Sequence, residues 1–271
     1  MLEKLEIAGG SITGRNHTVV GKNNQDAYFS ISNDQFAIAV VCDGCGSGKD
    51  SEVGAKIGVR LVVEEVADQL QIQPQLNQEF WEQVKLNVLE QLQGIAKLLS
   101  GNCSEFISQI INDYLLFTIV GVVITPIETV TFSIGDGIVF VNGEVSYAGK
   151  FPDNAPPYLA YGLYHADLID FHIHDRLPTG EVKSILIGTD GVADLIAAEF
   201  SHLPKKAECV GSISQFWQDD RYFSNPDQIR RRLSQVNYEF IKPNWSNRTL
   251  TKETGLLPDD TTLIVIRKKS S

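Results

Sequence analysis

The chain has 271 residues, and its 43% hydrophobic content can fill a core without disulfide bonds. Acidic residues outnumber basic residues by 34 to 23, which gives a net charge of −11 and argues against nucleic acid or an anionic membrane as a partner. No linker-like stretch divides the sequence, so we expect residues 1–271 to form a single, monomeric domain.

Other features of the sequence predict the cellular compartment of the protein. The first residues, MLEKLEIAGG, lack a basic region followed by an apolar run, and no apolar stretch reaches membrane-spanning length. The 4 cysteines are too few for a disulfide framework and are expected to be reduced thiols. Cys42 and Cys45 form a C-x-x-C pair that we interpret as incidental, because Cys42 ends a buried run and no second ligand pair is evident. We therefore expect a cytoplasmic protein.

The first half of the chain predicts one strand followed by helices. A short apolar run at residues 34–42 predicts a buried strand, which leads at once into a glycine-rich loop at 43–48. Apolar residues then recur at helical spacing in three segments, which we expect to be helices: 51–66, 77–99 and 104–114.

The second half of the chain predicts mainly antiparallel strands. Two hairpins are expected, one from strands 115–125 and 129–134, the other from strands 138–141 and 145–147 around Asn142-Gly143. Residues 149–180 contain four prolines and predict an irregular segment that covers a site. The remaining expected elements are strand 184–189, helix 191–198, helix 226–241 and strand 261–266. This order favours an α+β layered sandwich over a doubly wound parallel sheet.

The glycine-rich loop does not fit a nucleotide-binding motif. Asp43 lies six positions before Lys49, where a Walker A loop requires glycine, and Asp50 follows the lysine, where the motif requires Ser or Thr. Both carboxylates would repel phosphate. The glycines instead allow the backbone to come close to a metal ion bound at Asp43.

Five aspartates lie at the ends of apolar runs, most of them beside glycine: Asp26, Asp43, Asp136, Asp190 and Asp259. A single aspartate at such a position is commonly a turn or N-cap residue. Several strand ends that converge would make an oxygen-ligand site, and the absence of an accompanying Cys/His cluster favours Mg²⁺ or Mn²⁺ over zinc. His172 and His174 are expected on an exposed polar strand face rather than at a metal.

These aspartates lie in five ordered motifs: NQDA at 24–27, VVCDG at 40–44, SIGDG at 133–137, GTDGV at 188–192 and DDTTLIV at 259–265. In order and approximate spacing, the motifs resemble those of the PP2C-type (PPM) metal-dependent serine/threonine phosphatases, from Gly14 to Ile266. The segment from Gly14 to His17 resembles a bacterial branch of that family, in which histidine rather than the usual arginine precedes the first acidic motif. The resemblance implies a four-layer αββα sandwich, with two antiparallel sheets flanked by helices and two metal ions in a cleft between the sheet edges.

The resemblance also implies a role for each matched residue. Asp43 would bridge two Mn²⁺ or Mg²⁺ ions, the Gly44 carbonyl would complete one ion, and Asp190 and Asp259 would hold the other. Asp26 would orient the water that attacks phosphorus. A third ion is possible in this family, and Asp113 is either its ligand or a solvent-facing helix residue. Asp136 is not a ligand in this resemblance and is expected to stabilise a turn.

The chain departs from the family pattern at two places. Cys45 stands where animal members carry a histidine as general acid, which leaves protonation of the leaving group to water. The arginine that grips the substrate phosphate is missing before Gln25, and the candidates to replace it are Arg15, His17 and Lys22. His17 and Asp26 are also the candidate catalytic residues.

The resemblance implies a phosphatase that hydrolyses phosphoserine or phosphothreonine in a phosphorylated protein, through a hydroxide that bridges the two ions. Cys45 and the missing arginine motivate an alternative, a catalytically weak regulatory module that binds a phosphoprotein without cleaving it. A third hypothesis keeps the enzyme and makes its substrate a phosphorylated regulator of transcription, as in bacterial stress-response phosphatases. We predict the phosphatase, and the residues do not decide whether its substrate is such a regulator.

Overall fold

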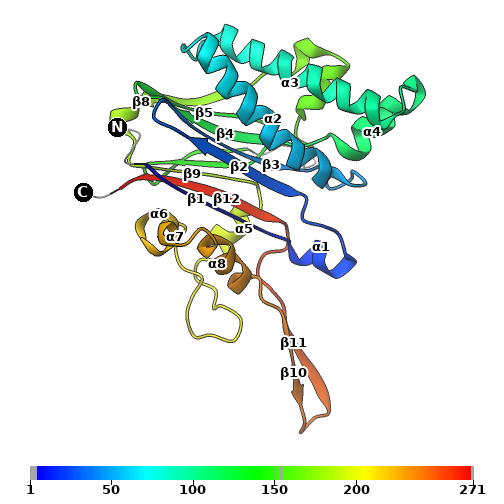
Figure 1. The fold of residues 1–271 in the computed structure, drawn as a ribbon. Coiled ribbons are helices and arrows are strands. Elements are labelled where there is room, and N and C mark those ends of the chain that lie inside the picture. Colours follow the sequence, from blue (N-terminus) through cyan, green and yellow to red (C-terminus); the bar gives the residue numbers. More distant parts are fainter. Residues whose placement is uncertain (1–4, 150, 153–154, 270–271) are drawn as a thin grey trace.

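Two five-stranded sheets stack face to face between two layers of helices in the computed structural model of the chain (Figure 1). The structure describes residues 5–149, 151–152 and 155–269. All strand pairs in both sheets are antiparallel. This arrangement confirms the predicted α+β class and the αββα layers.

The first sheet has the order β2-β3-β4-β5-β8. Its strands are β2 (Asp26–Ser32), β3 (Ala37–Asp43), β4 (Ile119–Ile124), β5 (Glu128–Ile134) and β8 (His172–Pro178). Strand β4 is buried along its whole length, which explains why its sequence is a continuous apolar run rather than an alternating one.

The second sheet has the order β1-β12-β9-β6-β7. Its strands are β1 (Leu5–Ile12), β12 (Thr261–Lys268), β9 (Ser184–Gly188), β6 (Ile138–Val141) and β7 (Glu144–Ala148). The predicted turn between β6 and β7 is present, with Asn142 and Gly143 both at positive φ, 55° and 91°, as a two-residue hairpin of this kind requires.

The inner faces of the two sheets meet in a dry layer of small and β-branched side chains. Ala37 and Ala39 of β3 lie opposite residues such as Ile264 and Ile266 of β12 in this layer, and all four are almost completely buried. Small residues on one sheet facing branched residues on the other let the sheets pack at close distance.

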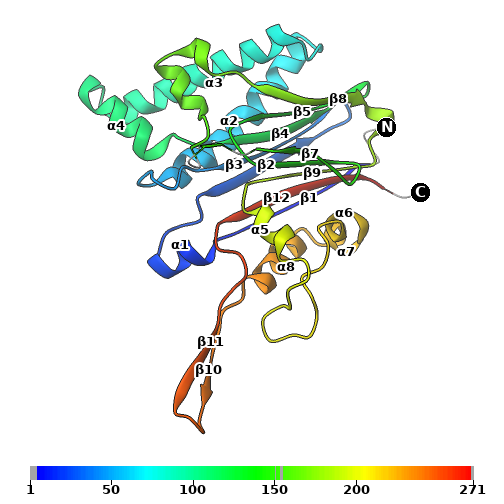
Figure 2. The same cartoon turned by 180° about the vertical axis from the view of Figure 1, so that it is seen from behind.

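Helices cover the two outer faces (Figures 1 and 2). The first sheet is covered by α2 (Ser51–Ile72), α3 (Gln78–Leu99) and α4 (Ser104–Tyr114). Trp81 of α3 packs on Phe132 and Phe171, with ring centroids 4.7 and 5.5 Å away. The second sheet is covered by α5 (Val192–Ala197), α6 (Gln215–Gln218), α7 (Arg221–Ser224) and α8 (Gln228–Val236). No helix in the described part of the chain is long and apolar enough to cross a membrane.

Two sequence predictions were wrong. Residues 149–180 are not irregular throughout, because β8 pairs with β5 at the edge of the first sheet. The helix expected at 226–241 ends at Val236, and the chain continues into a hairpin of β10 (Phe240–Asn244) and β11 (Thr249–Glu253) that projects from the body (Figure 1). Asn237 follows the last helical residue. Its side-chain amide donates a hydrogen bond to the Thr13 carbonyl and accepts one from the Leu257 N–H, and these bonds hold the chain as it leaves the helix.

Candidate active site

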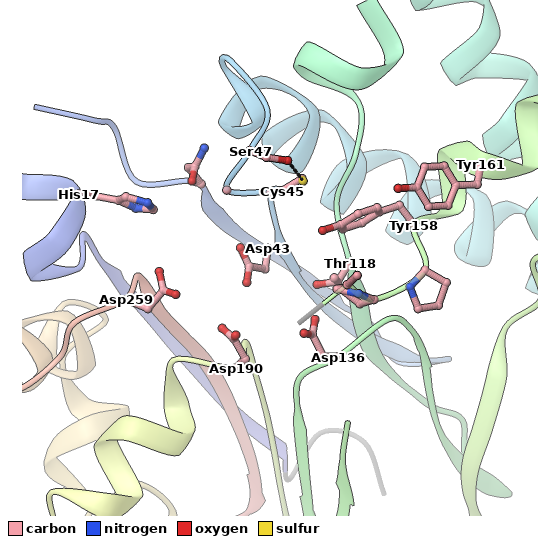
Figure 3. Close-up of a pocket in the computed structure, with 16 residues that line it drawn as sticks. His17, Asp43, Cys45, Ser47, Thr118, Asp136, Tyr158, Tyr161, Asp190 and Asp259 are labelled. Atoms are coloured by element: carbon pink, nitrogen blue, oxygen red, sulfur yellow. Dashed lines mark hydrogen bonds between the residues drawn. The ribbon is translucent and has the colours of Figure 1, made fainter. Parts of the chain in front are cut away.

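A cavity of about 610 Å³ opens at one end of the sandwich, where loops from both sheets meet (Figure 3). Its described lining residues are His17, Gln25, Asp43, Gly44, Cys45, Gly46, Ser47, Thr118, Asp136, Ala155, Pro156, Pro157, Tyr158, Tyr161, Asp190 and Asp259. Asp43, Asp136, Asp190 and Asp259 surround its centre, and His17 and Tyr158 lie on opposite walls. Four of the five aspartates singled out from the sequence thus share one cavity.

Strand pairing explains this convergence. Asp43 ends β3 and lies directly opposite Asp26, the first residue of β2. In the second sheet, β9 and β12 are antiparallel neighbours, so Asp190, just after β9, and Asp259, just before β12, reach the same end. Each sheet therefore contributes carboxylates to the space between them.

The loop after β3 is held tightly in place. Gly44 donates its N–H to the Gln25 carbonyl at 3.1 Å, and the Asp43 carbonyl accepts the Thr118 N–H at 2.8 Å. A Cβ atom on Gly44 would lie 2.8 Å from the Ser51 carbonyl oxygen, so only glycine fits there. The backbone of the Asp43-Gly44 pair is fixed at the cavity wall.

The carboxylates of this cavity are electrostatically frustrated. Burial, and then repulsion by Asp26, Asp190 and Asp259, raises the pKa of Asp43 well above its usual value. Burial, followed by repulsion from Asp259 and Asp136, raises the pKa of Asp190 to about 6. Several like charges in a partly desolvated space are unfavourable unless a cation compensates them.

The donor set fits a hard divalent cation. Among the described residues, buried oxygens without a hydrogen-bond partner include Oδ1 of Asp26, Oδ1 of Asp190 and Oε1 of Gln25. Such groups in a native structure call for an explanation, and an ion is one. Carboxylate and carbonyl oxygens are the ligands that Mg²⁺ and Mn²⁺ prefer.

Asp26 lies behind this cavity rather than on its lining. It is 4% exposed, and its Oδ2 accepts a 2.7 Å hydrogen bond from the Thr189 hydroxyl. Burial is the main reason that its pKa is well above the usual value. Its second oxygen, Oδ1, is the unpartnered one.

His17 is oriented by Asp260, a residue to which the sequence assigned no role. His17 lies on the short helix α1 (Arg15–Val20), and its Nδ1 is 2.9 Å from Asp260 Oδ2. Asp260 also accepts the backbone N–H groups of Gly14 and Gln25, both at 2.6 Å. The only sequence signal was a second acidic residue before a buried strand, which does not distinguish a structural anchor from a ligand.

The other two candidates for phosphate binding lie off the cavity lining. Arg15 Nη1 donates to the Gly255 carbonyl at 2.9 Å. Lys22 Nζ donates to the carbonyl of Gly46, a lining residue, at 3.0 Å and is exposed. The structure therefore brings only His17 of the three into the cavity.

Asp113 lies on α4 and is not among the described lining residues. Its carboxylate accepts a hydrogen bond from Gln109 at 3.3 Å, and its carbonyl accepts the Asp50 N–H. Its role as a third-ion ligand stays a prediction. His174 lies 2.9 Å from the Ser133 hydroxyl and stacks on Tyr147, also outside the described lining.

On the wall opposite His17, sequence reasoning had singled out Cys45 but missed the two tyrosines. This wall comprises Cys45 and Ser47, whose Sγ and Oγ atoms are 3.1 Å apart, together with Tyr158 and Tyr161. Both tyrosines lie in the segment expected to be irregular, at and within the short 3-10 helix η3 (Leu159–Leu163). That segment does cover the site, but no residue pattern distinguished these two tyrosines from others.

Comparison with known proteins places this geometry in a family. The model of the protein phosphatase 2C family matches residues 13–234, whereas no curated protein matches the chain. A bacterial serine phosphatase structure is 14% identical with a TM-score of 0.54, over 98% of this chain and 99% of that chain. Serine/threonine phosphatase Stp1 from Staphylococcus aureus is 14% identical with a TM-score of 0.55, and the match covers 98% of this chain and 96% of the Stp1 chain. A sex determining protein of C. elegans is 10% identical with a TM-score of 0.53, and the match covers 97% of this chain and 64% of that protein's chain.

The structural likenesses, at such low identity, establish a shared fold, and the family match covers most of the sequence. This confirms the resemblance drawn from the five motifs. The chain belongs to the protein phosphatase 2C family.

Proposed function

We propose that this protein is a Mn²⁺- or Mg²⁺-dependent phosphatase that hydrolyses phosphoserine and phosphothreonine in proteins. One observation carries the proposal. Carboxylates delivered by both sheets surround a single cavity, the pKa values of Asp43 and Asp190 are raised, and buried oxygens at the site have no partner among the described residues. An oxygen-rich site of this kind suits hard cations and, through them, a phosphate ester.

The residues that would hold two ions are Asp43, the Gly44 carbonyl, Asp190 and Asp259, with Asp113 as the candidate for a third. When bound, such ions lower the pKa of water and offset negative charge on phosphoryl oxygens. Without them, the acidic cavity would repel a phosphate ester. The ions therefore supply both substrate attraction and activation of the attacking water.

The protein's own groups would position the reactants. The free Oδ1 of Asp26, fixed by the bond from Thr189 to its other oxygen, is suited to accept a hydrogen bond from the attacking water. Asp260 Oδ2 lies 2.9 Å from His17 Nδ1 and positions the ring at the cavity wall, so His17 is the best-placed of the three candidates to contact the phosphoryl group. Lys22, at the rim, is suited to contact the protein substrate farther out.

The test is hydrolysis of p-nitrophenyl phosphate and of a phosphoserine peptide with added Mn²⁺, compared with the same protein in a chelator. Asp43→Asn, which keeps the side-chain shape, should abolish Mn²⁺-dependent turnover. The matched control is Asp34→Asn, which changes an exposed aspartate in the β2–β3 turn and should leave turnover unchanged. Turnover that is insensitive to both metal and Asp43→Asn would refute the proposal.

A second candidate function is a binding module that recognises a phosphoprotein without cleaving it. The observation that favours it is the absence of any lysine or arginine among the described residues that line the cavity. Titration calorimetry with a phosphoserine peptide in saturating Mn²⁺ separates the two candidates. Tight binding with undetectable turnover supports the module, and turnover excludes it.

A further inference from the structure

Tyr158 places a hydroxyl group inside the cavity, on the wall opposite His17. Its side chain is 8% exposed and belongs to the core beneath the helices that cover the first sheet. Its ring meets the Tyr161 ring edge to face, with centroids 5.5 Å apart. Figure 3 shows the hydroxyl directed toward Asp43. A buried ring with one polar tip in the cavity is a rigidly held hydrogen-bond donor.

Hydrolysis of a serine phosphate requires such a donor. The breaking bond leaves its electron pair on the serine oxygen, and an alkoxide is far too basic to depart unprotonated near neutral pH. A positioned side chain that supplies the proton typically accelerates such a step by about 10² to 10⁴. Carboxylic acids that hold cations are ionised and have no proton to give.

Three other hydroxyl or thiol groups of the described lining, those of Ser47, Tyr161 and Cys45, are less suitable. Ser47 is exposed in a glycine-rich loop. Tyr161 is 39% exposed, and its hydroxyl lies farther from the aspartates than that of Tyr158. The Cys45 Sγ atom already lies within hydrogen-bond distance of the Ser47 hydroxyl, at 3.1 Å. Tyr158 combines burial, a fixed ring and a direction toward the reaction centre.

We propose that Tyr158 is a catalytic residue that protonates the departing serine or threonine oxygen. This inference rests on the proposed phosphatase function. Water attacks phosphorus as the phosphorus–oxygen bond to the serine breaks, and the bonding pair stays on the serine oxygen. That oxygen takes the Tyr158 proton. The proton released by the attacking water returns to Tyr158 through solvent, so the products are a free hydroxyl and inorganic phosphate.

The protonation state of Tyr158 is consistent with this role. Burial, followed by interaction with Cys45 and repulsion from Asp43, keeps the pKa of Tyr158 above its usual value. The phenol therefore retains its proton throughout the neutral range, and transfer from it to a serine alkoxide remains favourable, since the alkoxide is the stronger base.

The test compares leaving groups of different acidity in Tyr158→Phe. p-Nitrophenolate departs readily as an anion, phenolate less readily, and a serine alkoxide hardly at all. We expect Tyr158→Phe to keep kcat/KM for p-nitrophenyl phosphate within about twofold and to lower it about 10²-fold for a phosphoserine peptide, with phenyl phosphate in between. Mn²⁺ affinity measured by calorimetry should match that of the wild type.

Tyr161→Phe is the matched control, since it removes a hydroxyl from the same wall and should leave the ratio between substrates unchanged. An equal loss on all three substrates, or weakened Mn²⁺ binding, would mean that Tyr158 is only structural and would overturn the assignment. An undiminished rate of Tyr158→Phe on the phosphoserine peptide would also overturn the assignment. Failure of the wild type to hydrolyse p-nitrophenyl phosphate with Mn²⁺ is a separate result, which overturns the proposed function itself.

Discussion

Removing one charge from the cavity should stabilise the metal-free protein in a pH-dependent way. Asp190 is the clearest case, because its folded-state pKa is about 6 and its usual value is 3.8. Each pKa unit is worth about 1.36 kcal/mol, so the ionised Asp190 costs the folded state up to about 3 kcal/mol near pH 8, and about 1 to 3 kcal/mol once solvent screening is included.

The sign follows from proton binding. The folded protein binds the Asp190 proton more tightly than the unfolded chain, so protonation contributes stability below about pH 4 that is lost as the pH rises through about 6. Asp190→Asn has no proton to lose. We therefore expect the variant and the wild type to be equally stable near pH 4, and the variant to be about 1 to 3 kcal/mol more stable near pH 8.

The assay is urea denaturation of chelator-treated protein, followed by fluorescence of the 3 tryptophans at both pH values. Asp34→Asn, in an exposed turn, is the control and should not change stability at either pH. If Asp190→Asn is no more stable than the wild type near pH 8, the reasoning about charge repulsion is wrong. A gain of the same size at both pH values would also refute it, because the cause would not be titration.

Two further predictions concern ligands. Mn²⁺ at about 100 times its dissociation constant should stabilise the wild type by about 2.7 kcal/mol, which raises Tm by roughly 5 to 10 °C. Asp43→Asn should remove most of that Tm shift in a thermal melt. An undiminished shift in the variant would place the ions elsewhere. His17→Ala should raise KM for p-nitrophenyl phosphate by about tenfold or more, through loss of a charge-assisted hydrogen bond, whereas Arg15→Ala, whose guanidinium already bonds Gly255, should leave KM nearly unchanged. The reverse order in steady-state kinetics would identify Arg15 as the phosphate ligand.

The buried inner strands β3, β4, β5 and β9, and the carboxylates at strand ends, were predictable because both leave local signals. Continuous β-branched runs such as β4 and β9 predict buried strands, and aspartate followed by glycine marks the point where a strand ends. The predicted helix ran into the first two residues of β10, and the rest of the hairpin of β10 and β11 was not predicted, because its apolar residues are few and its surface is exposed. An exposed ribbon has no buried face to impose an alternating pattern.

Asp260 and Tyr158 were not predictable as site residues, for a different reason. Asp260 matters because Gly14, His17 and Gln25, which lie far away in sequence, converge on its carboxylate. Tyr158 matters because its hydroxyl enters the cavity beside Cys45. Neither role leaves a trace in the neighbouring residues, since each depends on contacts over long sequence separations.

The sequence by itself indicated the α+β class through its periodicity, and through its ordered aspartate motifs it indicated the family and the layers that the family resemblance implies, because both are local properties of the chain. Only the tertiary structure decided which of these groups act together. Antiparallel pairing sets Asp26 against Asp43, and the stacking of two sheets brings Asp190 and Asp259 to the same cavity. Burial and like charge then raise the pKa values of Asp43 and Asp190. Those forces depend on distance and on desolvation, which only the folded chain establishes.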